Sequence, residues 1–101
     1  MANAFKSYQS TSVTTETTVL TGPASTETTV IGLSIANTSS SATTASVKLN
    51  TAYIVKDAPV PVGGSLVVIG ADQKVVVEAT DTLKVTAADT VDVCVSTLEI
   101  S

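Results

Sequence analysis

Apolar and polar residues alternate in short runs along most of this 101-residue chain. The clearest run lies within 26–37, where Ile31, Leu33 and Ile35 are large and the residue after each of them is small. A period of two predicts a β-strand whose large side chains point toward a core. The small residues on its other face leave room for the close approach of a neighbour. They are Gly32, Ser34 and Ala36.

Similar runs predict about eight short strands at a spacing of roughly 8 to 12 residues, and no segment has the period of a helix. The expected strands occupy 13–21, 26–37, 45–50, 51–57, 65–70, 74–79, 82–87 and 91–100. This pattern is typical of an all-β fold. It predicts a single antiparallel β-sandwich, jelly-roll or Ig-like, or a small barrel.

Clusters of turn-forming residues separate the expected strands. Turns or loops are expected at 21–25, 37–44, 71–73, 80–81 and 87–90. Near Asn50 and Thr51 two strands joined tightly are favoured, and one long bent strand is the alternative. The segment APVPVGG at 58–64 is excluded as a central strand, because proline lacks the N–H that a sheet ladder requires.

A six-residue repeat, T-E-T-T-V followed by an aliphatic residue, occurs at 15–20 and again at 26–31. Solenoids need at least three stacked repeats, so two copies around a Gly-Pro predict the two arms of a hairpin. Cross-strand pairs of the repeat threonines are then expected. A flat threonine array that binds ice or a polysaccharide would need more rungs than two copies supply.

Residues 1–12 are polar and hold Phe5 and Tyr8, two of the three aromatic residues of the chain. Because they lie outside any clear strand period, they predict an extended N-terminal arm that docks on a partner. A frayed terminus is the alternative. The predicted organisation is an arm at 1–12 and one sandwich domain at 13–101.

The composition favours strands, with 44% hydrophobic residues but only 3% aromatic, and valine and threonine abundant. The net charge is −4, and the five lysines lie singly at 6, 48, 56, 74 and 84. Nucleic-acid binding and docking on an anionic membrane both need clustered basic residues, so neither partner is expected. The start has no apolar signal segment and no apolar run is long enough to span a membrane, which predicts a soluble protein.

Enzymatic activity is not expected. Without histidine the chain lacks the commonest general base and the commonest transition-metal ligand, and no serine has the context of a nucleophile. The segment 62–65 is a turn rather than a phosphate loop, because no Lys-Ser or Lys-Thr and no helix follow it. Asp72 and Asp81 lie in turns, Asp89 and Asp92 flank 90–91, and none of them has the close spacing of a calcium loop. No catalytic residue, metal site or cofactor is therefore predicted.

Cys94 is the only cysteine, so no disulfide can form within the chain. Its Val-Asp-Val-Cys-Val context predicts a strand residue that acts as a small buried or half-buried hydrophobe. Such a free thiol is compatible with assembly in a reducing cytoplasm.

Four segments resemble a family of short virion structural proteins of tailed bacteriophages, marine and cyanobacterial phages in particular. They are MANAFKSYQS at the start, 28–49, 52–85 and VCVSTLEI at 93–100, so the likeness covers nearly the whole chain. The most specific part is Pro-Val-Gly-Gly-Ser-Leu at 61–66, followed by Asp-Thr-Leu-Lys-Val at 81–85. The link between 47–49 and 53–55 is short where longer loops are expected in some relatives.

The resemblance implies a non-enzymatic β-sandwich located in the virion and assembled in the host cytoplasm. The expected role is a capsid decoration or cement subunit that binds the major capsid protein and other copies of itself, with a trimer as one arrangement. Phe5 and Tyr8 are the expected partner contacts. The alternatives are a neck, tail or fibre-attachment protein and a carbohydrate-binding adhesion module.

Overall fold

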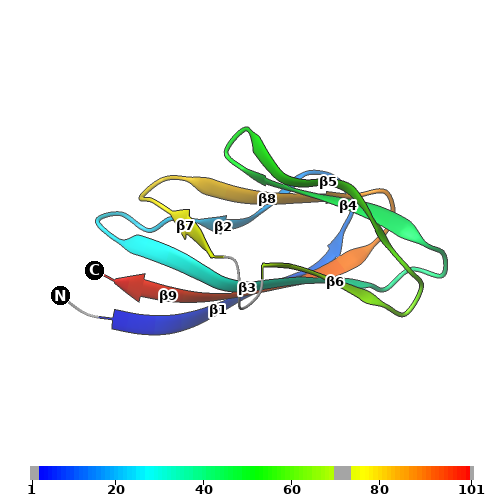
Figure 1. Cartoon of the computed structure of the whole chain (residues 1–101), viewed down its shortest axis with the longest axis horizontal. Helices are drawn as coiled ribbons and strands as arrows, with labels where there is room; N and C mark the ends of the chain where they lie inside the picture. The colour runs from blue at the N-terminus through cyan, green and yellow to red at the C-terminus, as the bar shows by residue number, and fades with distance from the viewer. Residues whose placement is uncertain (1–2, 70–73, 101) are drawn as a thin grey trace.

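The structure is a computed structural model that describes residues 3–69 and 74–100. Two antiparallel sheets pack face to face, and the described residues contain nine strands and no helix (Figure 1). Sheet A contains β1 (Asn3–Val13), β9 (Val91–Ile100), β3 (Glu27–Asn37) and β6 (Ser65–Ile69) in that order, with β7 (Val75–Val77) also paired to β3. Sheet B contains β2 (Thr17–Thr21), β8 (Thr82–Ala87), β4 (Thr43–Leu49) and β5 (Ala52–Val60) in that order. The predicted all-β sandwich is confirmed.

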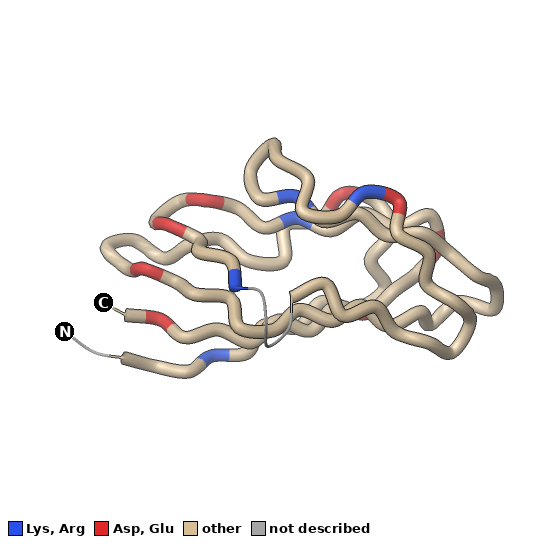
Figure 2. Tube along the Cα trace, in the orientation of Figure 1, with Lys and Arg blue, Asp and Glu red and all other residues tan. Residues whose placement is uncertain are grey.

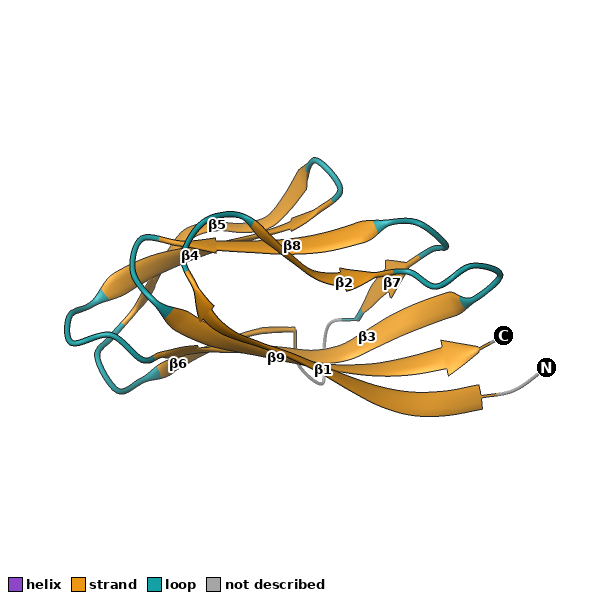
Figure 3. Cartoon of the chain, turned by 180° about the vertical axis from the view of Figure 1, so that it is seen from behind, coloured by secondary structure: helices purple, strands orange, loops and turns teal. Residues whose placement is uncertain are grey.

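The chain changes sheets at most of its connections. Loops therefore gather at the two ends of the elongated molecule, which measures 45 × 23 × 22 Å (Figure 3). The connection between β4 and β5 stays within sheet B, because these strands are neighbours and Leu49 lies opposite Ala52. Asn50 has a positive φ of 55° in this turn, a conformation that asparagine tolerates better than most residues. The predicted tight joint at Asn50 and Thr51 is confirmed.

The predicted hairpin between the two sequence repeats is wrong. The first repeat supplies β2 to sheet B, where Thr17 lies opposite Val85. The second supplies β3 to sheet A, where Thr28 lies opposite Glu99 and Val77. The repeat threonines therefore form no cross-strand pairs with each other. Each copy is a strand with a buried face, and the segment between them crosses from one sheet to the other.

Gly22 lies in the segment that crosses from β2 to β3, and its backbone anchors this segment to the turn before β8. Its N–H donates to the carbonyl of Asp81 at 2.8 Å, and its carbonyl accepts from the N–H of Thr80 at 3.0 Å. A β-carbon at Gly22 would lie 2.1 Å from the carbonyl oxygen of Glu78. The backbone approach is thus too close for any other residue.

Residues 3–12 do not form an arm outside the sandwich. They belong to β1, whose residues Asn3 to Ser10 pair without interruption with Ile100 to Val93 of β9. The polar composition misled the prediction because β1 is an edge strand. Most of its side chains are exposed, and its backbone hydrogen bonds hold it to the sheet.

Among the described residues, the buried side chains of the core include no aromatic one, although the half-buried Tyr8 packs against them. The buried hydrophobic residues of the core are Val13, Val19, Leu20, Val30, Leu33, Ile35, Ala45, Val47, Val60, Val68, Ile69, Val77, Leu83, Val85, Ala87, Val91, Val93 and Val95. Full burial of one valine or leucine contributes about 1.5–3 kcal/mol. The predicted inward face of β3 is confirmed at Leu33 and Ile35. It is wrong at Ile31, because the pairing with β9 shifts register between Val30 and Gly32 and turns Val30 inward instead.

The proline-rich segment 58–64 is not part of a central strand, as predicted. β5 is an edge strand that includes Pro59, and the following turn is closed by a 3.0 Å hydrogen bond from the N–H of Gly64 to the carbonyl of Pro61. The strand expected at 74–79 is shorter, at Val75–Val77. The turn expected at 71–73 lies outside the described residues.

Asn37 organises the loop that follows β3. Its buried side-chain amide donates to the carbonyls of Ser41 and Val60 at 2.9 and 3.1 Å. Its side-chain oxygen accepts from the N–H and the hydroxyl of Ser39 at 2.9 and 2.6 Å. The side chain therefore joins the crossover loop to the end of β5.

Candidate interaction face

The outer surface of sheet A, called here the A face, consists of the strand side chains that point away from the core. One row crosses four strands through successive partners: Phe5 lies opposite Leu98, Leu98 opposite Thr29, and Thr29 opposite Val76. A second row runs from Gln9 through Cys94 and Ser34 to Val67. Backbone pairing therefore brings together residues that are far apart in the sequence.

Large apolar side chains are exposed on this face. Phe5 is 78% exposed, Val67 65% and Val76 54%. The strand residues of the face carry no charge except Glu27 and Asp92, one toward each end, while Lys74 directly precedes β7. Figure 2 shows charged positions gathered on sheet B and at the end that carries the termini. A sheet surface with so few charges and with exposed aliphatic and aromatic side chains can pack against another protein while desolvating few ions.

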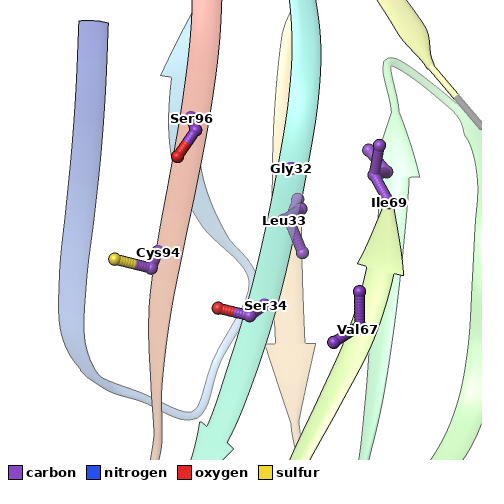
Figure 4. A pocket seen from close by; sticks show the side chains of 7 residues that line it. All are labelled: Gly32, Leu33, Ser34, Val67, Ile69, Cys94 and Ser96. Carbon is purple, nitrogen blue, oxygen red and sulfur yellow. The ribbon is translucent and has the colours of Figure 1, made fainter. Parts of the chain in front are cut away.

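Small side chains form the centre of the A face. Two shallow depressions of about 250 and 290 Å³ adjoin there and share Ser34 and Cys94. Gly32 of β3, Ser96 of β9 and Val67 of β6 line the first depression (Figure 4). The small residues predicted for close approach are thus located at the hollow of the sheet.

Cys94 is exposed, so its predicted burial is wrong. In β9 its neighbours Val93 and Val95 point into the core, and strict alternation turns the thiol onto the A face. The motif predicted burial because of its valines, which are indeed buried. Cys94 alternates with them along the strand and therefore lies on the opposite face.

Phe5 and Tyr8, the two expected partner contacts, lie on opposite faces of β1. Phe5 belongs to the A face, whereas Tyr8 points inward and donates its hydroxyl hydrogen to the carboxylate of Glu99. This hydrogen bond, with burial and the negative charge of Glu99, raises the pKa of Tyr8 to about 12. Phe5 is available to a partner in this conformation, and Tyr8 is engaged within the sandwich.

The outer surface of sheet B differs in charge. Lys48 lies opposite Lys84, and the ammonium groups of Lys48 and Lys56 lie 5.5 and 5.2 Å from the centre of the Tyr53 ring. Lysines that are scattered along the sequence are therefore clustered by the fold. Glu16 forms an ion pair of 2.6 Å with Lys48, which lowers the pKa of its carboxyl and raises the pKa of the lysine. This face carries both signs of charge, at Glu16 and at the lysines.

Three of the four aspartates considered as calcium ligands form hydrogen bonds with nearby groups. Asp81 accepts from the N–H of Glu78 and from the side chain of Asn50, both at 3.1 Å. Asp89 accepts from the N–H of Thr90, and Asp92 from the N–H of Ser12. Asp72 lies outside the described residues. Within 3–69 and 74–100, no three histidine, cysteine or acidic residues are grouped as metal ligands would be.

Comparison with family models, with curated proteins and with solved structures found no match to this chain. Over the ranges that the structure describes, no helix is long and apolar enough to cross a membrane. The pairing register was the signal that sequence reasoning missed. Phe5 and Val76 belong to one row across the A face only because β9 and β3 pair between their strands.

Proposed function

We propose that this chain is a non-enzymatic structural protein of a tailed-phage virion, a decoration or cement subunit that binds the major capsid protein. The observation that carries the proposal is the A face, whose strand residues carry charge only at Glu27 and Asp92, on a chain of net charge −4. A subunit that coats a shell needs one surface that excludes water on contact and another that stays hydrated. The A face and the outer surface of sheet B differ in this way.

The sequence resemblance supports the same class of function. The segments that carry it cover nearly the whole chain, including β6 and most of β1, β3 and β9, the strands that form most of the A face. The resemblance supports a virion location, and the A face offers a surface for the proposed contact. The docking surface we propose is centred on Phe5, Leu98, Val67 and the hollow beside Cys94.

Cys94 provides a direct test, because the free chain exposes its thiol at the centre of the proposed contact. A maleimide should label the free chain rapidly and should label the particle-bound chain at least about tenfold more slowly. A control variant, Cys94→Ser with Ser40→Cys, carries its thiol in an exposed loop and should react at similar rates in both states. Equal labelling of Cys94 in both states would exclude the A face as the contact.

Substitutions on the two faces separate this contact from a general loss of folding. Phe5→Asp and Val76→Asp place a charge on exposed positions of the A face and should each weaken particle binding by about tenfold or more. Thr18→Asp places the same charge on an exposed position of sheet B and should leave binding unchanged. Circular dichroism should show intact strands in all three variants.

Copy number distinguishes decoration from the neck or tail alternative. Mass spectrometry of purified particles should give many copies per virion, and electron microscopy of a labelled chain should show them over the head. A ring of few copies at the neck would instead support the neck or tail alternative. The carbohydrate-binding alternative gains no support from the aromatic residues, because the exposed rings of Phe5 and Tyr53 lie on different sheets.

A further inference from the structure

Each sheet has two edge strands, whose outward backbone N–H and C=O groups can pair with another strand unless something prevents it. Three of the four edges are obstructed: the edge formed by β2, the edge formed by β6 with β7, and the edge formed by β5. β2 and β6 have five residues each, and both have a register shift against their neighbour. β7, which pairs with β3 beside β6, has three residues.

β5 is longer but obstructed in several ways. It contains Pro59, its pairing with β4 shifts register twice, and Asp57 has a positive φ of 51°. Lys56 and Asp57 add charge in the middle of the strand. Proline, bulges and charge are the features by which natural sheets prevent pairing at an edge.

β1 is the exception. It has eleven residues, no proline and one charged side chain, Lys6. Its first eight residues, Asn3 to Ser10, pair with β9 without a register shift, so this part of the strand is regular. A regular edge of this length presents alternate residues whose N–H and C=O groups point away from the sheet.

We propose that β1 pairs antiparallel with β1 of a second copy of this chain, so that the two sheets A form one continuous sheet. The pairing would satisfy the outward backbone groups of both strands at once. A two-fold axis perpendicular to the sheet relates the copies, which makes the contact isologous. The inference concerns self-association and does not depend on virion binding.

The charge distribution of β1 suits a second copy. In an antiparallel pair centred on Ser7, Lys6 lies opposite Tyr8, and in a pair centred on Tyr8 it lies opposite Ser10. Neither register places Lys6 opposite itself, so no like charges meet across the joint. The two A faces then lie on the same side of the joined sheet, with a Phe5 from each copy near the joint.

Sedimentation velocity over a concentration series tests the pairing in the purified chain. The wild type should form a dimer. The variant Ser7→Lys/Gln9→Lys places four added ammonium groups at the joint, so its dimer dissociation constant should rise about tenfold or more at low salt. The matched control Ser40→Lys/Ala88→Lys adds the same charge at exposed loop positions and should dimerise like the wild type.

Spin labels provide a second readout in a chain that keeps β1 close to native. With Cys94→Ser and Ser7→Cys, nitroxides on the two copies should lie within about 20 Å, because paired strands are less than about 5 Å apart. Labels at Ser40→Cys should lie farther apart. Short distances at residue 7 support the pairing even if the lysine variant fails to fold.

Three results would overturn the inference. They are a wild type that stays monomeric at its highest soluble concentration, equal loss of dimer in both lysine variants, and residue-7 labels far apart in a dimer. A loss of particle binding in the β1 variant would not by itself show pairing with the shell protein, because Ser7 and Gln9 also lie on the A face. Cys94 protection on particles is measured separately, so the two proposals fail independently.

Discussion

Tyr8 of β1 donates its hydroxyl hydrogen to the carboxylate of Glu99 in β9, across the inner side of the two paired strands. The hydroxyl of Thr97 donates to the carbonyl of Lys6 at 3.3 Å, which adds a second link between the same strands. Glu99 is only 8% exposed, so its carboxylate depends on the hydroxyls of Tyr8 and Thr97 in place of water, the latter at 3.5 Å. Besides its backbone pairing, β1 is thus held to β9 by two hydrogen bonds of polar side chains, although few of its own side chains are buried.

Because of the Tyr8–Glu99 hydrogen bond, the free energy of unfolding should decrease as the pH rises into the alkaline range. The folded state raises the pKa of Tyr8 from 10.0 to about 12. The contribution is therefore complete below about pH 10 and is lost as pH rises through about 12. Tyr8→Phe should lower the free energy of unfolding by about 1–3 kcal/mol at pH 8. Urea unfolding should show that this difference between variant and wild type vanishes near pH 12.

Absorbance measurements can isolate the group responsible. The chain has two tyrosines, so a Tyr53→Phe variant reports Tyr8 alone. Its ultraviolet absorbance should change with a midpoint near pH 12 while circular dichroism still shows a folded chain. A midpoint near pH 10 would mean that the hydroxyl is not bonded to Glu99.

Thr28 offers a stabilising substitution. Its side chain is fully buried, and its hydroxyl is the one buried side-chain polar atom without a hydrogen-bond partner in the described ranges. Thr28→Val keeps the shape and removes the unpaired hydroxyl, so it should stabilise the chain by about 1 kcal/mol. Thr97→Val is the matched control and should destabilise, because that hydroxyl has partners. Equal effects of the two in thermal unfolding would contradict the assignment.

Gly22 should tolerate no side chain. Its β-carbon would meet the backbone of Glu78, so Gly22→Ala requires the crossing between sheets to move and should cost about 3 kcal/mol or more. The control is Gly32→Ala, whose β-carbon would meet only ordinary contacts at 3.9 Å, and it should change stability by less than about 1 kcal/mol. Chemical denaturation of both variants gives the comparison.

Asn37 should be critical for the loop after β3. Asn37→Ala leaves the carbonyl of Val60 and the N–H of Ser39 without their partner, so we expect a loss of about 2–4 kcal/mol. Asn37→Asp retains the acceptor but loses both donor bonds and places a charge at a 6% exposed position. It should therefore rescue little. Hydrogen exchange should rise first at the end of β5 in both variants.

The alternation of residues was enough to predict the sandwich and the β4–β5 joint, and the prolines correctly excluded 58–64 from a central strand. It failed where pairing partners decide the outcome. The repeats at 15–20 and 26–31 have the same local pattern, but β8 and β9 draw them into different sheets. Local pattern also assigned β1 to a free arm, because an edge strand held by backbone bonds leaves almost no apolar signature.

β9 lies between β1 and β3 in sheet A, although it follows every other strand along the chain. During synthesis the ribosome therefore releases β1 and β3 well before the strand that both must pair with. Sheet A cannot close until that strand emerges, so the nascent chain should remain sensitive to proteases over most of its length. Folding should then proceed as one late, slow event dominated by long-range contacts, on the order of milliseconds to seconds.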